Sequence, residues 1–174
     1  NYTQSTGKVK EMLDAVKAKL GMTPNMMKTM AQSPAVLEAY LRFSGALEGG
    51  KLNAKLRGQL ALVSAAINGC SYCASAHTAI GKIVGLDEDT ILAAREGTST
   101  EAKTDAALKF ARVILVNRGE IHDTDLDAVR AAGFDDGEIA EIIAHVAINT
   151  FTNYFNQIAN TEIDFPQIPA GATA

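Results

Sequence analysis

Apolar residues recur at intervals of three and four through most of this chain, most regularly from Ile139 to Ile158. This spacing returns side chains to one face of an α-helix, which turns about 100° per residue. No stretch alternates strongly between apolar and polar residues, as a half-buried strand would. The sequence therefore predicts an all-α fold of about eight or nine helices, packed as an orthogonal or bundle-like array.

Residues that cap or break helices divide the chain into these elements. Gly21 ends a helix over residues 7–20, and proline is at home in a first helical turn. A long helix is expected over residues 136–159, followed by an extended and partly disordered tail over 160–174. The remaining boundary residues are the two prolines Pro24 and Pro34, the predicted N-caps Asn53 and Asp87, and the capping boxes Thr124-x-x-Asp127 and Asp135-x-x-Glu138.

Length and charge limit the class of protein. A chain of 174 residues is predicted to be a single all-α domain spanning residues 1–174. The net charge of -4 is mild and gives no reason to expect a nucleic-acid surface. No apolar run reaches the roughly 18–20 residues of a membrane span, and no signal segment is recognisable. We therefore expect a cytoplasmic protein with no membrane and no nucleic-acid partner.

The chemistry of the chain is concentrated in Asn68-Gly69-Cys70-Ser71-Tyr72-Cys73-Ala74-Ser75-Ala76-His77, which holds both cysteines. Asn68-Gly69 readily ends one helix, so Cys70 should lie in the first turn of the next. Steps of three and four place Cys70, Cys73 and His77 on one helical face. A helix start, a C-x-x-C pair and a nearby histidine each lower a thiol pKa from roughly 8.5. The pair also satisfies the roughly 4.4–6.8 Å Cα separation of a disulfide.

These residue types suit a thiol peroxidase. A thiolate attacks the peroxide and becomes a sulfenic acid, and a second thiol then closes a disulfide. Cys73 lies four residues before His77 and is the predicted attacking thiol, with His77 as its base. Cys70, nearer the helix end, is the predicted resolving thiol and the one more exposed to a reductant. The lack of βαβ patterning excludes a thioredoxin fold.

Two other interpretations of the cysteines remain open. A closed zinc site needs four ligands, whereas Cys70, Cys73 and His77 supply three and leave His122 or His145 as distant candidates. The pair could also be inert. His145 is expected to be a satisfied core or interface histidine, with support of the thiols as the minority interpretation, and His122 a solvated loop residue. We predict no metal and no bound cofactor.

The segment Asn-Gly-Cys-x-Tyr-Cys-x-x-x-His after an apolar helix resembles the alkylhydroperoxidase D-like proteins of the carboxymuconolactone decarboxylase superfamily. The resemblance covers about residues 36–118, and the stretch from Ala147 to Asn156 is similar to one subgroup. It implies reduction of small peroxides, with Cys73 attacking, Cys70 closing the disulfide and His77 in a proton relay. It also implies an external thiol or dihydrolipoyl electron donor and a homo-oligomer, commonly a trimer or hexamer.

One departure from that family concerns the relay. The family usually carries a glutamate twelve residues before the first cysteine, where this chain has Gly58. Either Gln59, Arg57 or water replaces it in part, or peroxide turnover is weak and another thiol reaction matters. Two rival functions follow: a lactone decarboxylase that needs no cysteine cycle, and a non-catalytic module in which Asn149, Asn153 and Asn156 serve a subunit contact.

Overall fold

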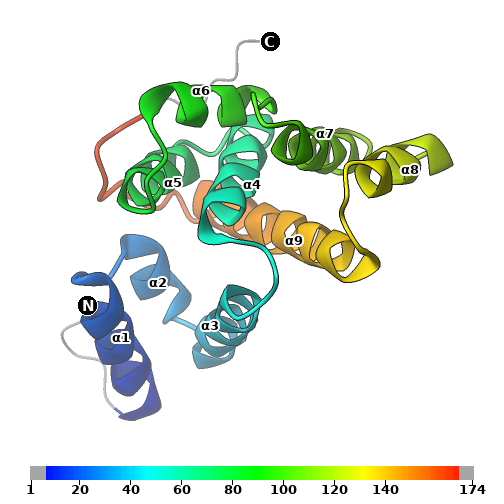
Figure 1. Ribbon diagram of the computed structural model, residues 1–174. Coiled ribbons are helices and arrows are strands. Elements are labelled where there is room, and N and C mark those ends of the chain that lie inside the picture. Colours follow the sequence, from blue (N-terminus) through cyan, green and yellow to red (C-terminus); the bar gives the residue numbers. More distant parts are fainter. Residues whose placement is uncertain (1–6, 169–174) are drawn as a thin grey trace.

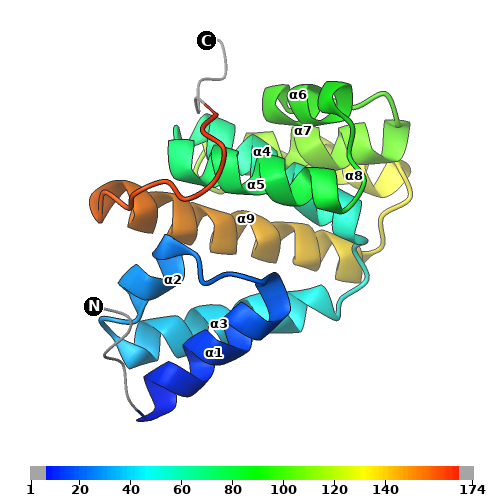
Figure 2. The same ribbon diagram turned by 90° about the vertical axis from the view of Figure 1, so that its left-hand side faces the viewer.

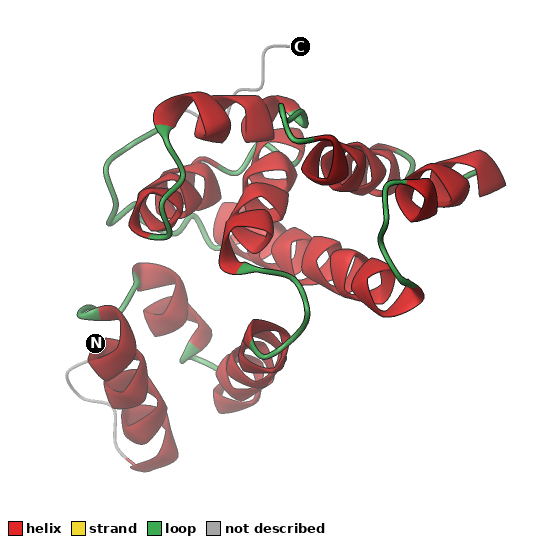
Figure 3. Ribbon diagram, viewed as in Figure 1, coloured by secondary structure: helices red, strands yellow, loops and turns green. Residues whose placement is uncertain are grey.

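The computed structural model describes residues 7–168, which form nine α-helices and no strand (Figures 1 and 3). The all-α prediction is confirmed. None of these nine helices is long and apolar enough to span a bilayer. The helices are α1 (Gly7–Leu20), α2 (Asn25–Met30), α3 (Pro34–Glu48), α4 (Ala54–Ile67), α5 (Ser71–Ile83), α6 (Glu88–Glu96), α7 (Ala102–Val116), α8 (Asp123–Ala131) and α9 (Asp136–Ile158).

Helix α4 is the centre of the structure. It packs against α5, α6, α7 and α9, and Figure 1 shows it surrounded by them. Every residue from Gln59 to Ala66 is buried, so the helix has no solvent-facing side over more than two turns. A helix that is buried all round fixes the positions of its neighbours, and α4 thereby positions the cysteine segment that follows it.

The buried side chains form two clusters. The first joins α4 to α6, α7, α8 and α9 through residues such as Leu60, Leu108 and Ile142. The second joins α1, α2 and α3 to α5 and contains Cys70 and Cys73. Figure 2 shows α1, α2 and α3 on one side of α9, with α4 to α8 on the other. The cysteines therefore lie where the N-terminal helices meet the rest of the chain.

Most predicted helix caps are present. Asn53 Oδ1 accepts from Leu56 N at 2.9 Å, and Asp87 Oδ1 accepts from Thr90 N at 2.7 Å. Asp135 and Glu138 form the reciprocal capping box that opens α9. These bonds satisfy N–H groups that a helix start leaves unpaired.

The cap predicted for α8 is wrong by two residues. Its N-cap is His122 rather than Thr124, and the Asp125 carboxylate accepts from His122 N at 2.9 Å. The run Asp123-Thr124-Asp125 offers several capping registers, and local spacing alone did not separate them.

The described part of the C-terminal tail, residues 160–168, follows α9 without forming another helix and is held by hydrogen bonds, and its partial disorder stays a prediction. Asp164 accepts from the Tyr72 hydroxyl at 2.9 Å and from Asn25 N at 2.7 Å. Further along, Ile168 N donates to Ser75 Oγ at 2.8 Å. The tail is therefore fastened to α5 and to the start of α2. The rest of the predicted tail, residues 169–174, lies outside the described residues.

Gly58, inside α4, generates a stability prediction. A Cβ added there would meet Leu86 Cδ1 at 3.6 Å, an ordinary contact. Glycine inside a helix costs up to about 1 kcal/mol relative to alanine. Gly58→Ala should therefore raise the free energy of unfolding by about 0.5–1 kcal/mol in chemical denaturation.

The matched control is Gly97→Ala. Gly97 has a φ of +78°, and its Cβ would meet Val63 Cγ2 at 3.3 Å, so this variant should be destabilised. A loss of stability in Gly58→Ala would contradict the packing described around position 58.

Candidate functional site

The turn between α4 and α5 positions the first cysteine. Gly69 has a φ of 69°, which glycine adopts without a steric cost. Cys70 N then donates to Ala65 O at 2.9 Å, so the chain reverses over the end of α4. Cys70 is the N-cap of α5, not a residue of its first turn as the sequence predicted. The difference matters because an N-cap side chain can itself accept a backbone N–H.

Cys70 and Cys73 form a disulfide, with Cα atoms 5.3 Å apart. Each sulfur also accepts an N–H group. Cys73 N lies 3.2 Å from Cys70 Sγ, and Asn156 Nδ2 lies 3.4 Å from Cys73 Sγ. Such contacts are weak for a neutral sulfur and stronger for a thiolate, because hydrogen bonds to charged acceptors gain most. The same two N–H groups would be placed to stabilise a thiolate if the disulfide were reduced.

Asn156 is the site residue that sequence reasoning missed. It lies on α9, 83 positions from Cys73, and is 3% exposed. Asn153, one turn earlier, accepts from Asn68 Nδ2 at 2.9 Å. The sequence signal for it was the row of asparagines along α9, which we had interpreted as a subunit contact. Asn149, Asn153 and Asn156 are instead buried within one chain, and the last two face the start of α5.

His77 lies one turn beyond Cys73 on α5 and is partly buried. Desolvation lowers the His77 pKa to about 4, so the imidazole is neutral at pH 7. Among residues 7–168 no hydrogen bond joins it to Cys73, whose polar partner is Asn156. A neutral imidazole can accept a thiol proton, but it supplies no positive charge to hold a thiolate.

His145 does not lie beside the sulfurs. It precedes Asn156 by eleven residues, which is about 16 Å along α9. It is buried, and its Nε2 has no partner among the described residues, so the expectation of a satisfied histidine is wrong at that atom. Burial and then the charge of Arg57 lower the His145 pKa to about 4. His122, the N-cap of α8, is exposed.

The zinc interpretation finds no support in the arrangement of ligands. Across residues 7–168, no three side chains of histidine, cysteine, aspartate or glutamate come together in a way that could hold a metal ion. Cys70 and Cys73 are joined to each other. In the described structure the cysteine segment is therefore a disulfide-bonded pair.

Both sulfurs are covered. Cys70 is 1% exposed and Cys73 is 2% exposed, so the prediction that Cys70 is the more exposed thiol is wrong. The cluster that contains the disulfide includes three methionines of α2, and Ile163 and Phe165 of the tail pack on it. Phe165 meets the Tyr72 ring edge to face, with centroids 5.8 Å apart. We expect movement of the tail to increase access to the sulfurs.

The fastening of the tail generates a prediction about access. Asp164→Ala removes the acceptor for both Tyr72 and Asn25 N, each bond contributing about 1 kcal/mol. The tail should open more often, and the disulfide should be reduced by a water-soluble phosphine on the order of tenfold faster.

Asp89→Ala, at an exposed aspartate on α6, is the matched control and should leave the rate of reduction unchanged. Equal rates for Asp164→Ala and the unmodified chain would show that the tail does not limit access.

Comparison with known proteins agrees with this geometry. The model of the carboxymuconolactone decarboxylase family matches residues 34–115, close to the predicted 36–118. No protein of curated function matches the chain.

Three solved structures share the fold. An uncharacterized peroxidase-related protein from Silicibacter sp. TM1040 has a TM-score of 0.81 and 25% identity, over 89% of this chain and 84% of that chain. The alkylhydroperoxidase AhpD core protein from Ralstonia eutropha JMP134, also named peroxidase-related, has a TM-score of 0.82 and 24% identity, over 94% and 89%. The debrominase Bmp8 has a TM-score of 0.77 and 24% identity, over 90% and 86%. The family match over residues 34–115 and the shared helical fold support a relationship of this chain to the carboxymuconolactone decarboxylase family, with the fold of the alkylhydroperoxidase AhpD core protein.

Proposed function

We propose that this chain is a dithiol peroxidase that reduces a small hydroperoxide by cycling Cys70 and Cys73 between dithiol and disulfide. The observation that carries the proposal is the disulfide itself, with one N–H donor directed at each sulfur. The likeness to proteins named peroxidase-related supports it.

The proposed reaction has two steps at the sulfurs. The Cys73 thiolate attacks the outer oxygen, the O–O bond breaks, and Cys73 becomes a sulfenic acid as an alcohol or water leaves. The Cys70 thiol then attacks that sulfur, releases water and forms the disulfide. An external reductant, either a dihydrolipoyl group or a simple thiol, supplies two electrons and two protons to restore the pair.

The proposed proton carrier is His77. Because burial keeps its pKa near 4, the imidazole is neutral at pH 7 and has a free acceptor site for the thiol proton, but it is a weak base. It would then pass that proton to the leaving oxygen. Gly58 offers no carboxylate to assist, so turnover should be slower than with a complete relay. Loss of a general base typically lowers the rate by roughly 10²–10⁴-fold.

Single replacements of the cysteines test the assigned roles. Cys73→Ser should lower peroxide consumption by at least about a thousandfold, because the attacking sulfur is lost. Cys70→Ser should still react once and accumulate a sulfenic acid that dimedone traps, as seen by mass spectrometry.

The opposite pattern would reverse the roles, and peroxide consumption by Cys73→Ser at the unmodified rate would end the proposal.

2,3,4-Tribromopyrrole, which is bound in another structure of the debrominase, serves as a comparison compound. Loss of carbon dioxide from a carboxylated lactone after both thiols are alkylated would instead favour the decarboxylase alternative.

The contact from Asn156 to Cys73 predicts an effect on thiol ionisation. Asn156→Leu removes one hydrogen bond to the thiolate and should raise the Cys73 pKa by about one unit. Asn156→Asp keeps the shape and adds a negative charge, so its effect should be larger. The measurement is the pH dependence of alkylation of Cys73 in the reduced Cys70→Ser background.

Asn117→Leu, at the C-cap of α7, is the control and should not move the midpoint. An unchanged midpoint in both Asn156 variants would mean that the side chain packs beside the sulfur without stabilising the thiolate.

A homo-oligomer is part of the proposal. An apolar groove of about 400 Å³ runs between α3 and α9, with Phe43 42% exposed and Phe151 43% exposed at its edge. A second copy would cover it. Phe43→Asp should lower the mass measured by light scattering, whereas Ile83→Asp, at an exposed residue outside the groove, should not. An unmodified chain that is already monomeric would contradict this expectation.

A further inference from the structure

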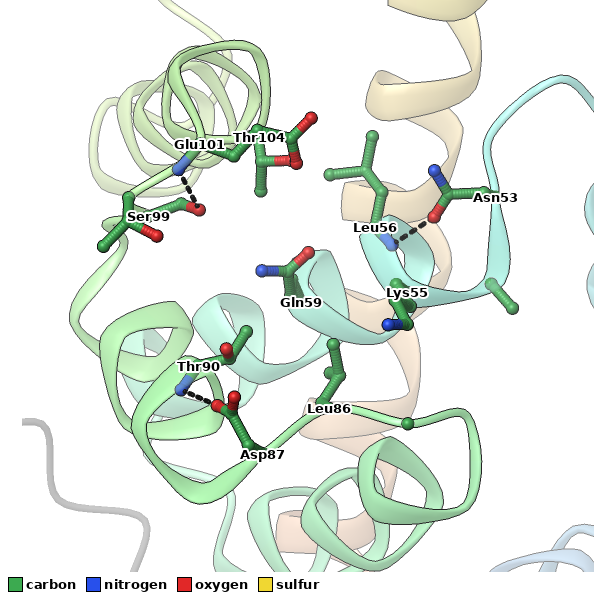
Figure 4. A pocket seen from close by; sticks show the side chains of 13 residues that line it. Asn53, Lys55, Leu56, Gln59, Leu86, Asp87, Thr90, Ser99, Glu101 and Thr104 are labelled. Carbon is green, nitrogen blue, oxygen red and sulfur yellow. Dashed lines mark hydrogen bonds between the residues drawn. The ribbon is translucent and has the colours of Figure 1, made fainter.

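A second concave site lies at the opposite end of the α4–α5 hairpin from the cysteines. It is a pocket of about 540 Å³ where the first turns of α4, α6 and α7 converge (Figure 4). Gln59 marks its floor and precedes the end of α4 by eight residues, which is about 12 Å of helix. The pocket is therefore distinct from the disulfide, and its volume lies within the roughly 300–1,000 Å³ of small-molecule sites.

Gln59 is the feature that indicates a ligand. Its side chain points into the pocket in Figure 4, and the residue is only 5% exposed. No hydrogen bond joins its amide to any other residue in the described part of the chain. Its amide atoms are not sealed from the pocket, so they can pair with water or with a ligand that enters it. Gln59 therefore presents one N–H₂ donor and one carbonyl acceptor, side by side, to whatever occupies the pocket.

The neighbouring polar groups are already engaged. The Thr104 hydroxyl donates to Glu101 Oε2 at 2.6 Å, and Asp87 Oδ1 accepts from Thr90 N at 2.7 Å. These contacts stabilise the starts of α6 and α7 and are explained without a ligand. The Gln59 amide is thus a nearly buried group of this pocket whose hydrogen-bonding capacity no described residue uses.

The charges at the rim favour a neutral ligand. The opening is lined by one cation, Lys55, and by two carboxylates, Asp87 and Glu101. Hydrogen bonds from Thr90 and then the charge of Lys55 keep the Asp87 pKa below its usual value, so both signs of charge are present at neutral pH. An anion would meet the two carboxylates and a cation would meet Lys55. The walls include Leu56 and Leu86, which suit an apolar body.

We propose that this pocket binds a small neutral heterocycle or amide that presents an N–H donor beside a carbonyl acceptor to Gln59. The complementary edge would form two parallel hydrogen bonds with the side-chain amide, as glutamine does with the donor and acceptor edge of a base. Leu56 and Leu86 would contact the body of the ligand. This site is independent of the thiol chemistry proposed above.

The test uses 2-pyridone, which carries this edge, and N-methyl-2-pyridone, which lacks the N–H. Each is titrated into the isotope-labelled full chain while the backbone amide signals of Thr90 and Thr104 are followed by NMR. We expect 2-pyridone to shift these signals with a dissociation constant roughly in the millimolar range, as its few atoms allow. N-methyl-2-pyridone should bind about tenfold more weakly, because it leaves the Gln59 carbonyl unpaired.

Variants assign the effect to Gln59. Gln59→Leu should abolish the shifts caused by 2-pyridone, and Gln59→Glu, nearly the same shape, should also abolish them by replacing the donor with a carboxylate. Gln32→Leu makes the same change at an exposed residue outside the pocket and should bind as the unmodified chain does. Thermal melting checks that each variant is folded. If Gln59→Leu is unfolded, the result for Gln59→Glu decides the test.

The proposal is overturned if 2-pyridone at tens of millimolar does not shift the Thr90 and Thr104 amide signals of the unmodified chain. It is also overturned if the two pyridones bind equally, or if the folded Gln59→Glu variant keeps its affinity for 2-pyridone.

Discussion

The structure depends on the buried polar contact between the end of α9 and the reversal that joins α4 to α5. Asn156 donates to Cys73 Sγ, Asn68 donates to Asn153, and Gln157 donates to Asn68 O at 2.9 Å. These bonds pair one polar atom each of Asn153 and Asn156 in the interior, where an unpaired amide group is costly, and so favour this register of the helices. The contact that anchors the C-terminal helix is thus the one that sets the surroundings of the reactive sulfur.

Burial and reactivity are in tension at this site. A dry, apolar environment raises a thiol pKa, because the thiolate loses its hydration. The N–H groups of Asn156 and of the Cys73 backbone offset that loss at the two sulfurs. These donors belong to α5 and α9, whereas Phe165, which packs on the same cluster, belongs to the tail. Opening would therefore admit both reactant and water to sulfurs that already have their donors.

The helices and the disulfide spacing could be predicted from residues close together in the sequence. The features that were missed depend on packing between residues far apart in the sequence. The helix pattern, the caps at Asn53 and Asp87 and the disulfide spacing all depend on residues within a few positions of each other. Asn156 and Cys73 are 83 residues apart, and Tyr72 and Asp164 are 92 apart. No spacing rule connects such pairs. Exposure of Cys70 was misjudged for the same reason, since it is buried in a cluster that includes residues of α2 and on which the tail packs.

Gly58 precedes Gln59 in α4 and is relevant to both proposed sites. The family that the sequence resembles usually carries a relay glutamate at this position, and the space beside Gly58 is bounded by Leu86, 3.6 Å from where a Cβ would lie. Leu86 is also a wall of the Gln59 pocket. A side chain longer than alanine at position 58 would extend toward that wall, whereas glycine leaves it in place. The same glycine supplies no carboxylate to the proposed proton relay, so one position of α4 affects both proposed sites.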